Sequence, residues 1–146
     1  MSSQTQFIAK LEKILTFLKN SKLEYLKASD RFNLPQNKRF FNMQSTLRNR
    51  FFQDVASLLR SMNVEMDNLV INKLNFEQIV ASSNTIIKQG HLEKCIELDK
   101  KLVKLYGEAL EIDPNHDILI HQNEKIAIVI QENIHFLENA GYVLES

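Results

Sequence analysis

Apolar side chains recur at every third or fourth position between Phe40 and Met62, which is the spacing of one buried face of an α-helix. At about 100° per residue, one broad arc of this helix carries Phe41, Leu47, Phe51, Val55, Leu58, Leu59 and Met62. Two polar side chains, Gln44 and Arg48, fall inside the same arc. We therefore expect a helix that directs an arginine into the core of the protein.

The segment before it carries a second helical pattern. Ser3 followed by Gln6 forms a capping box, which predicts the start of a helix. Apolar positions then follow at steps of three and four, with one lysine among them: Ile8, Leu11, Leu15, Leu18, Lys22 and Tyr25. Pro35 disfavours helical geometry at the residue before it, so this helix ends near Phe32 and the next one runs to about Asn63. A turn this short makes the two helices antiparallel neighbours.

The next stretch predicts a long connection that contains a short helix. Residues 64–74 are rich in apolar side chains but lack a sustained helical period, so we expect them to lie across the bundle. Asn75 and Gln78 form a second capping box, and Gly90 is a helix stop. These signals predict a short extra helix over residues 75–89.

Two further long helices complete the chain. The first is expected over residues 91–111. Asp113 precedes Pro114, which is the order of an N-cap followed by proline at the first helical position, so the last helix should begin there and end at Gly141. Four long helices with one long link predict a single all-α domain over residues 1–146, a four-helix bundle with a crossover.

Composition limits the partners and the cellular location. The chain has 146 residues with 18 basic and 18 acidic side chains, so no net charge would attract nucleic acid or an anionic membrane, and we expect neither partner. The single cysteine, Cys95, can form no disulfide within the chain and is interpreted as a small buried hydrophobic residue. The N-terminus lacks the pattern of a secretion signal, and no apolar run approaches about 18 residues, the length that marks a membrane span. We expect a cytoplasmic protein.

Polar side chains also fall on the buried arcs of the predicted helices, within one half of the bundle. They are Lys22, Gln44, Arg48, Asp99 and Asn133, with Tyr25 and Tyr106 as candidate further members. A buried arginine is costly alone but tolerable beside a carboxylate with further hydrogen bonds, so Asp99 is the expected partner of Arg48. Two interpretations stay open: an ion pair that fixes the register of the helices, or the lining of a pocket for a small polar ligand.

A series of residues follows the spacing of a known family. The series is Tyr25, Pro35, Phe41, Arg48, Phe51, Asp54, Val55, Cys95, Asp99, Tyr106 and Leu110. In this spacing the chain resembles a family of short bacterial ferritin-like four-helix proteins whose function is unassigned. It departs from the family at Asp99, where Glu is more usual, and at Asn63, where Gly is usual. The resemblance implies a ferritin-like four-helix bundle and little about chemistry.

The resemblance raises the question of a metal centre. Ferritin-like bundles with two metal ions take a Glu from each of two helices and a Glu-x-x-His pair from each of the other two, all pointing inward. Glu132 and His135 match that pair by letter, but both lie outside the apolar arc of their helix, and Glu24 likewise points away from its seam. Lys22 and Arg48 would add positive charge where a cation would bind. We expect no metal and no other cofactor, with a site at Glu132 and His135 as the alternative.

Three classes of function remain. No Ser/His/Asp arrangement and no glycine-rich phosphate loop occurs in the sequence, so an enzyme is not favoured. The first expectation is a non-catalytic protein with an interaction or stress-accessory role. The alternatives are an iron- or oxygen-handling protein and a bundle that binds a small molecule at the polar network. Phe17, Met43 and Ile128 fall on the outward sides of their helices, which favours an unidentified protein partner or a homo-oligomer.

Overall fold

The fold is a set of packed α-helices, as the sequence predicts. A computed structural model describes residues 2–32, 34–64 and 91–140, and the helices in these ranges are α1 (Ser3–Arg31), α2 (Pro35–Ser61), α4 (His91–Ile112) and α5 (Asp117–Ala140). No strand occurs in this described part of the chain. The all-α prediction is therefore confirmed for these residues.

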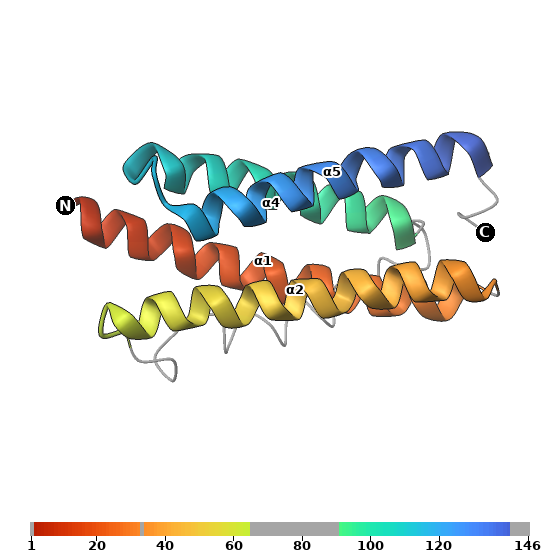
Figure 1. Cartoon of the computed structure of the whole chain (residues 1–146), viewed down its shortest axis with the longest axis horizontal. Coiled ribbons are helices and arrows are strands. Elements are labelled where there is room, and N and C mark those ends of the chain that lie inside the picture. The colour runs from red at the N-terminus through yellow and green to blue at the C-terminus, as the bar shows by residue number, and fades with distance from the viewer. Residues whose placement is uncertain (1, 33, 65–90, 141–146) are drawn as a thin grey trace.

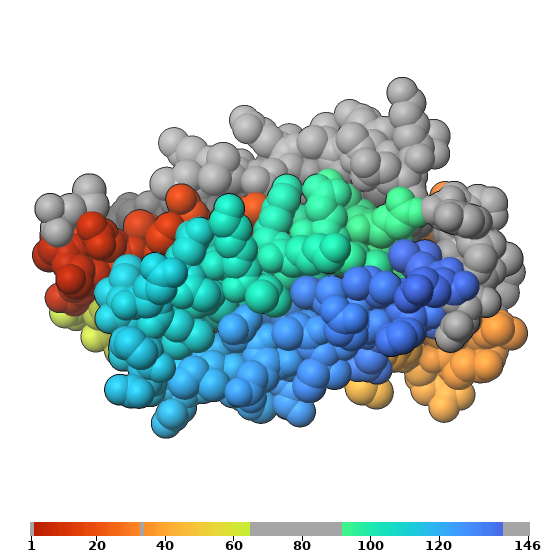
Figure 2. Space-filling view, turned by 90° about the horizontal axis from the view of Figure 1, so that it is seen from above, coloured from red at the N-terminus to blue at the C-terminus, as the bar shows by residue number. Residues whose placement is uncertain are grey.

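The four helices form two layers of two (Figure 1). The pair α1 and α2 is antiparallel, and so is the pair α4 and α5, whereas α2 and α4 run in the same direction. Such a parallel pair requires a long connection between the two layers. The α1 helix packs closely on both α2 and α4, and α4 packs on α5, while α2 and α5 make few close backbone contacts. Figure 2 shows α4 and α5 side by side on one face of the molecule.

The N-terminal cap of α1 lies one residue earlier than predicted. Ser2 has extended backbone angles, and its hydroxyl oxygen accepts a hydrogen bond from the backbone N–H of Thr5 at 3.1 Å. Ser3 is already the first helical residue, so the capping box expected between Ser3 and Gln6 does not form. The correction arises because Ser2 and Ser3 are chemically equivalent caps, and only the backbone angles distinguish them.

The α2 helix ends in a hydrogen-bonded turn over residues 59–64 that includes Asn63. Asn63 adopts a positive φ of 65°, a left-handed conformation that asparagine tolerates better than most residues. The backbone N–H of Asn63 donates to Arg60 at 3.0 Å, and that of Val64 donates to Leu59 at 3.0 Å. These two bonds satisfy carbonyl groups that the end of a helix would otherwise leave unpaired.

The start of α5 differs from the prediction by three residues. Its first helical residue is Asp117, not Pro114, because the backbone N–H of Asp113 still bonds to Ala109 of α4 at 3.1 Å. Pro114 therefore follows a helix end, a position where proline is common, and does not open a helix. The backbone N–H of His116 donates to Asp113 at 3.4 Å within the turn, and the carbonyl oxygen of His116 accepts the first bond of α5.

Some predictions fall outside the described residues. They are the connection over residues 65–74, the short helix over residues 75–89, its stop at Gly90 and the stop at Gly141.

The core gathers aromatic side chains at one end of the bundle. The ring of Phe41 lies 4.8 Å from that of Phe32, 6.2 Å from that of Tyr25 and 6.2 Å from that of Phe136, measured between centroids. Cys95 is fully buried with a free thiol, in agreement with the predicted small hydrophobic residue. Within the described ranges, the helices lack the length and apolar character that crossing a membrane requires.

Candidate functional site

Arg48 and Asp99 form a buried ion pair between α2 and α4. The Arg48 Nη2 atom donates to Asp99 Oδ2 at 2.8 Å, and Nε donates to Oδ1 at 3.3 Å. Both side chains are 0% exposed. Two donors on two acceptors give the planar, bidentate arrangement in which arginine holds a carboxylate best.

Three further side chains form hydrogen bonds with the remaining donors and acceptors of this pair. Gln44 Oε1 accepts from Arg48 Nη1 at 3.0 Å, one helical turn away on α2. From α1, the hydroxyl groups of Ser21 and Tyr25 donate to the two oxygens of Asp99, at 2.9 Å and 2.6 Å. The guanidinium carbon of Arg48 also lies 4.8 Å from the centre of the Tyr25 ring. A buried ion pair is tolerable when its remaining donors and acceptors are satisfied in this way.

Asn133 on α5 is the outermost member of the network, and its orientation follows from the other bonds. The Tyr25 hydroxyl gives its only proton to Asp99, so its oxygen can only accept from Asn133. Asn133 Nδ2 is the donor, at 2.8 Å. The network thus fixes which end of the Asn133 amide faces inward and directs its carbonyl oxygen elsewhere.

The ionisation of these groups follows from burial and from the Asp99 charge. Burial would lower the pKa of Arg48, but the charge and hydrogen bond of Asp99, together with the nearby Tyr25 and Cys95 side chains, raise it. Burial raises the pKa of Tyr25 well above its ordinary value, and the negative charge of Asp99 raises it further. The same two causes raise the pKa of the Cys95 thiol. The site therefore holds a charged arginine beside a neutral phenol and a neutral thiol.

Of the predicted members, the structure brings together Gln44, Arg48, Asp99, Asn133 and Tyr25 and leaves out Lys22. The ammonium group of Lys22 donates to Asn49 Oδ1 at 3.2 Å near the surface. A lysine can bury its stem along the helices while its charge stays in water. Ser21, which sequence reasoning missed, reaches Asp99 instead. Its signal was its position, three residues after Leu18 and four before Tyr25 on the same face of α1.

Tyr106 also lies outside the network. Its hydroxyl donates to Gln122 Oε1, and Gln122 Nε2 donates to the backbone carbonyl of Phe51 at 3.3 Å. Tyr106 and Gln122 are both buried, so they form a second polar tie that joins α4, α5 and α2.

The prediction that Glu24 points away from the core is wrong. It is 1% exposed, and neither carboxylate oxygen has a hydrogen-bond partner. Lys27 Nζ lies 3.6 Å from Glu24 Oε1. Because α1 packs on both α2 and α4, its buried arc is wider than the single seam that the spacing suggested.

The two residues of the alternative metal site lie on the surface. Glu132 is exposed, and His135 is 74% exposed with its Nδ1 atom 3.9 Å from Glu138 Oε1. In residues 2–32, 34–64 and 91–140, no three His, Cys, Asp or Glu side chains cluster in a way that could hold a metal ion. The buried carboxylates of this part of the chain are Glu24 on α1 and Asp99 on α4.

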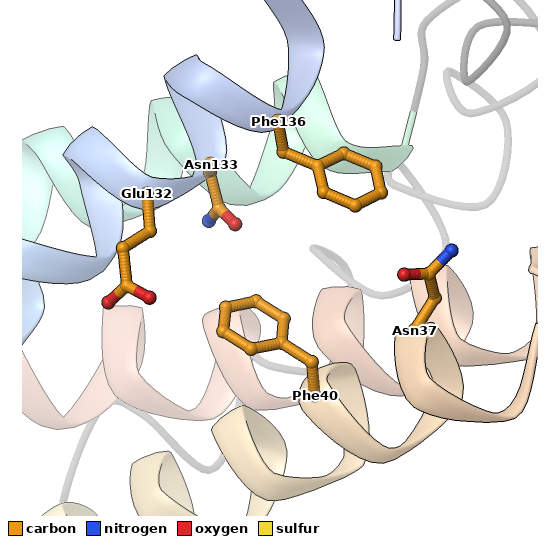
Figure 3. A pocket seen from close by; sticks show the side chains of 5 residues that line it. All are labelled: Asn37, Phe40, Glu132, Asn133 and Phe136. Carbon is orange, nitrogen blue, oxygen red and sulfur yellow. The ribbon is translucent and has the colours of Figure 1, made fainter. Parts of the chain in front are cut away.

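Glu132 instead lines a pocket between α2 and α5, next to the polar network. The pocket has a volume of about 250 Å³ and is lined by Asn37, Phe40, Glu132, Asn133 and Phe136. Figure 3 shows the three lining side chains of α5 on one side of the pocket and Phe40 and Asn37 of α2 on the other. The two helices that bound it, α2 and α5, make few close backbone contacts with each other.

No family model, curated protein or solved structure matches the chain.

Proposed function

We propose that this protein is a non-catalytic helical bundle that binds a small molecule in the pocket between α2 and α5. One observation carries the proposal: Asn133 belongs both to the wall of the pocket and to the buried network. Small-molecule sites are typically pockets lined by apolar and aromatic side chains with a few precisely placed polar groups, and the network gives Asn133 such a fixed placement. Of the functions expected from the sequence, the geometry favours the small-ligand alternative over the interaction or stress-accessory role.

The paired state of the buried polar groups supports a non-catalytic role. Arg48 and Asp99 bond to each other and to their neighbours, so neither presents a free charge to a substrate. The only cysteine, Cys95, is buried and its raised pKa opposes formation of the nucleophilic thiolate. A binding role uses the network as a support for the pocket wall.

The proposal retains two finer expectations. The parallel α2 and α4 helices support a ferritin-like crossover bundle, and the short extra helix stays a prediction because it lies outside the described residues. The free thiol of Cys95 supports a location in a reducing compartment such as the cytoplasm.

The test fills the pocket without disturbing the core. Asn37 is half-buried at the pocket edge, so Asn37→Trp should occupy the space, whereas Gln36→Trp on the same turn is exposed and does not line it. Both variants and the unmodified protein are screened by thermal shift against a panel of small metabolites of varied charge. We expect at least one compound to raise the melting temperature of the unmodified protein and of Gln36→Trp, but not that of Asn37→Trp. If no compound does so, the proposed function is wrong.

A second candidate, contact with another protein or a second copy, rests on Met43 and Ile128. They are 63% and 57% exposed on α2 and α5, while Phe17 is only half-buried and lies 5.9 Å from Lys101 Nζ. Sedimentation of the protein and of the double variant Met43→Lys, Ile128→Lys tests this candidate. A monomer at high micromolar concentration would remove the case for a homo-oligomer.

A further inference from the structure

We infer that the pocket between α2 and α5 takes a small organic cation, an ammonium group attached to an apolar body. This inference rests on the proposed function and names its ligand class. Three properties of the lining carry it: the direction of its hydrogen-bonding groups, its charge and its aromatic side chains.

Two of the three polar side chains of the pocket, Asn133 and Glu132, can present acceptors to it, while the amide of Asn37 can donate or accept. Asn133 Nδ2 donates one of its two N–H groups to the Tyr25 hydroxyl, and this bond orients the amide so that its carbonyl oxygen is free to face the pocket. Figure 3 shows this oxygen on the side of Phe136, where the pocket lies. No described residue donates a hydrogen bond to it. A carboxylate such as that of Glu132 is also an acceptor only. A ligand that satisfies both must therefore bring hydrogen-bond donors, and the charge and the aromatic side chains of the lining decide which kind.

The charge of the lining favours a cation. Glu132 is the only charged residue of the five, and no Lys, Arg or His lines the pocket. Glu132 forms no ion pair in the part of the chain that the structure describes, so its carboxylate is available to a bound ammonium group. The positive charge of Arg48 lies behind Asn133 and is already balanced by Asp99.

Two phenyl rings supply an apolar wall that also attracts cations. Phe40 and Phe136 approach the pocket from opposite helices (Figure 3). Both pack against the core ring of Phe41, at 5.3 Å and 6.2 Å between centroids, which holds them in place. The face of an aromatic ring attracts an ammonium group and contacts apolar carbon equally well. The lining thus suits a molecule that combines an ammonium group with an apolar body.

The volume sets the size of the ligand. A space of about 250 Å³ holds about eight groups of the size of a water molecule. Phenylethylamine, a primary amine on a short arm from one ring, is close to this size and is positively charged at neutral pH. Phenylethanol has the same shape without the charge, and phenylacetate carries the opposite charge.

The experiment measures binding of these three probes to the full chain by titration calorimetry. We expect phenylethylamine to bind about tenfold more tightly than phenylethanol, the range of a partly desolvated cation contact, and phenylacetate to bind most weakly. Glu132→Gln should remove most of the preference for the amine. Glu124 is exposed on the same helix and does not line the pocket, so Glu124→Gln should retain the preference for the amine.

The outcomes separate this inference from the proposed function. Equal binding of the amine and the alcohol, unchanged by Glu132→Gln, would show a pocket without cation selectivity and overturn the inference alone. Failure of all three probes to bind would also overturn it, and the pocket-filling comparison of Asn37→Trp with Gln36→Trp then decides whether the pocket binds another class of ligand. If that comparison also shows no difference for any compound, the proposed function fails as well.

Discussion

Arg48 on α2 and Asp99 on α4 meet through two hydrogen bonds at a position where neither side chain is exposed to solvent. The pair links two helices that run in the same direction and belong to different layers (Figure 1). It also supports Tyr25, which positions Asn133 at the edge of the α2–α5 pocket. The pair is therefore central both to the stability of the bundle and to the form of the pocket.

Removal of one partner of this pair should be strongly destabilising. Arg48→Ala should lower the free energy of unfolding by about 3–5 kcal/mol, because it leaves the Asp99 charge buried and unpaired. Replacing Arg48 with Met and Asp99 with Leu together should recover much of that loss. Urea unfolding measures both variants, and Arg50→Ala, an exposed arginine on the same helix, is the matched control. A loss below about 1 kcal/mol, which is typical of surface positions, would contradict the burial of Arg48.

Stability should fall at alkaline pH because two buried tyrosines resist ionisation. The pKa values of Tyr25 and Tyr106 are both raised, chiefly by burial. A raised folded-state pKa gives stability that is complete below the unfolded value of about 10 and is lost as the pH rises beyond it. We expect the ultraviolet tyrosinate signal of these two residues to appear only together with loss of helical circular dichroism. Ionisation of both phenols in a fully helical protein would refute their burial.

The left-handed conformation of Asn63 can be tested by substitution. Asn63→Gly should leave stability unchanged or raise it slightly, since glycine adopts a positive φ without a steric penalty. Asn63→Val should cost about 1–2 kcal/mol, because a side chain with a branched Cβ is disfavoured in that region. Thermal unfolding of the two variants measures the difference. Equal melting temperatures would mean that Asn63 does not close α2 in this conformation.

The protein should not depend on a metal ion. Purification without chelator, followed by elemental analysis, should give iron and manganese well below one atom per chain. Glu132→Ala and His135→Ala should leave that value unchanged, because both side chains lie on the surface of α5. Metal content near one or two atoms per chain that either substitution removes would restore the iron- or oxygen-handling alternative.

The spacing of apolar residues was sufficient to predict the helices and part of the site. Gln44 and Arg48 fall within the buried arc of their helix by the periodicity alone, and both are buried. The periodicity succeeds because a residue's direction on a helix is a local property, set by the roughly 100° turn between neighbours. The need for a carboxylate beside a buried arginine then indicated Asp99.

Local rules were insufficient where a choice depended on a neighbouring helix. Lys22 was expected in the core network but is half-buried with its charge near the surface, and Glu24 was expected to point outward but is buried. The width of the buried arc of α1 depends on its two neighbours, α2 and α4. The helical period places Ser21 on the correct face of α1, but only the approach of α4 makes it a partner of Asp99. Pro114 marks a helix boundary whether it opens one helix or follows the end of another. The bond from the backbone N–H of Asp113 to Ala109 shows that it follows the end of α4.

The sequence by itself therefore determined the helical class, the inward direction of Arg48 and the identity of its charge partner. Only the tertiary structure decided which polar groups bond to one another and where space remains between the helices. The α2–α5 pocket exists because two helices far apart along the chain pack loosely against each other. That separation is set by the side chains packed throughout the bundle, and no local pattern in either helix records it.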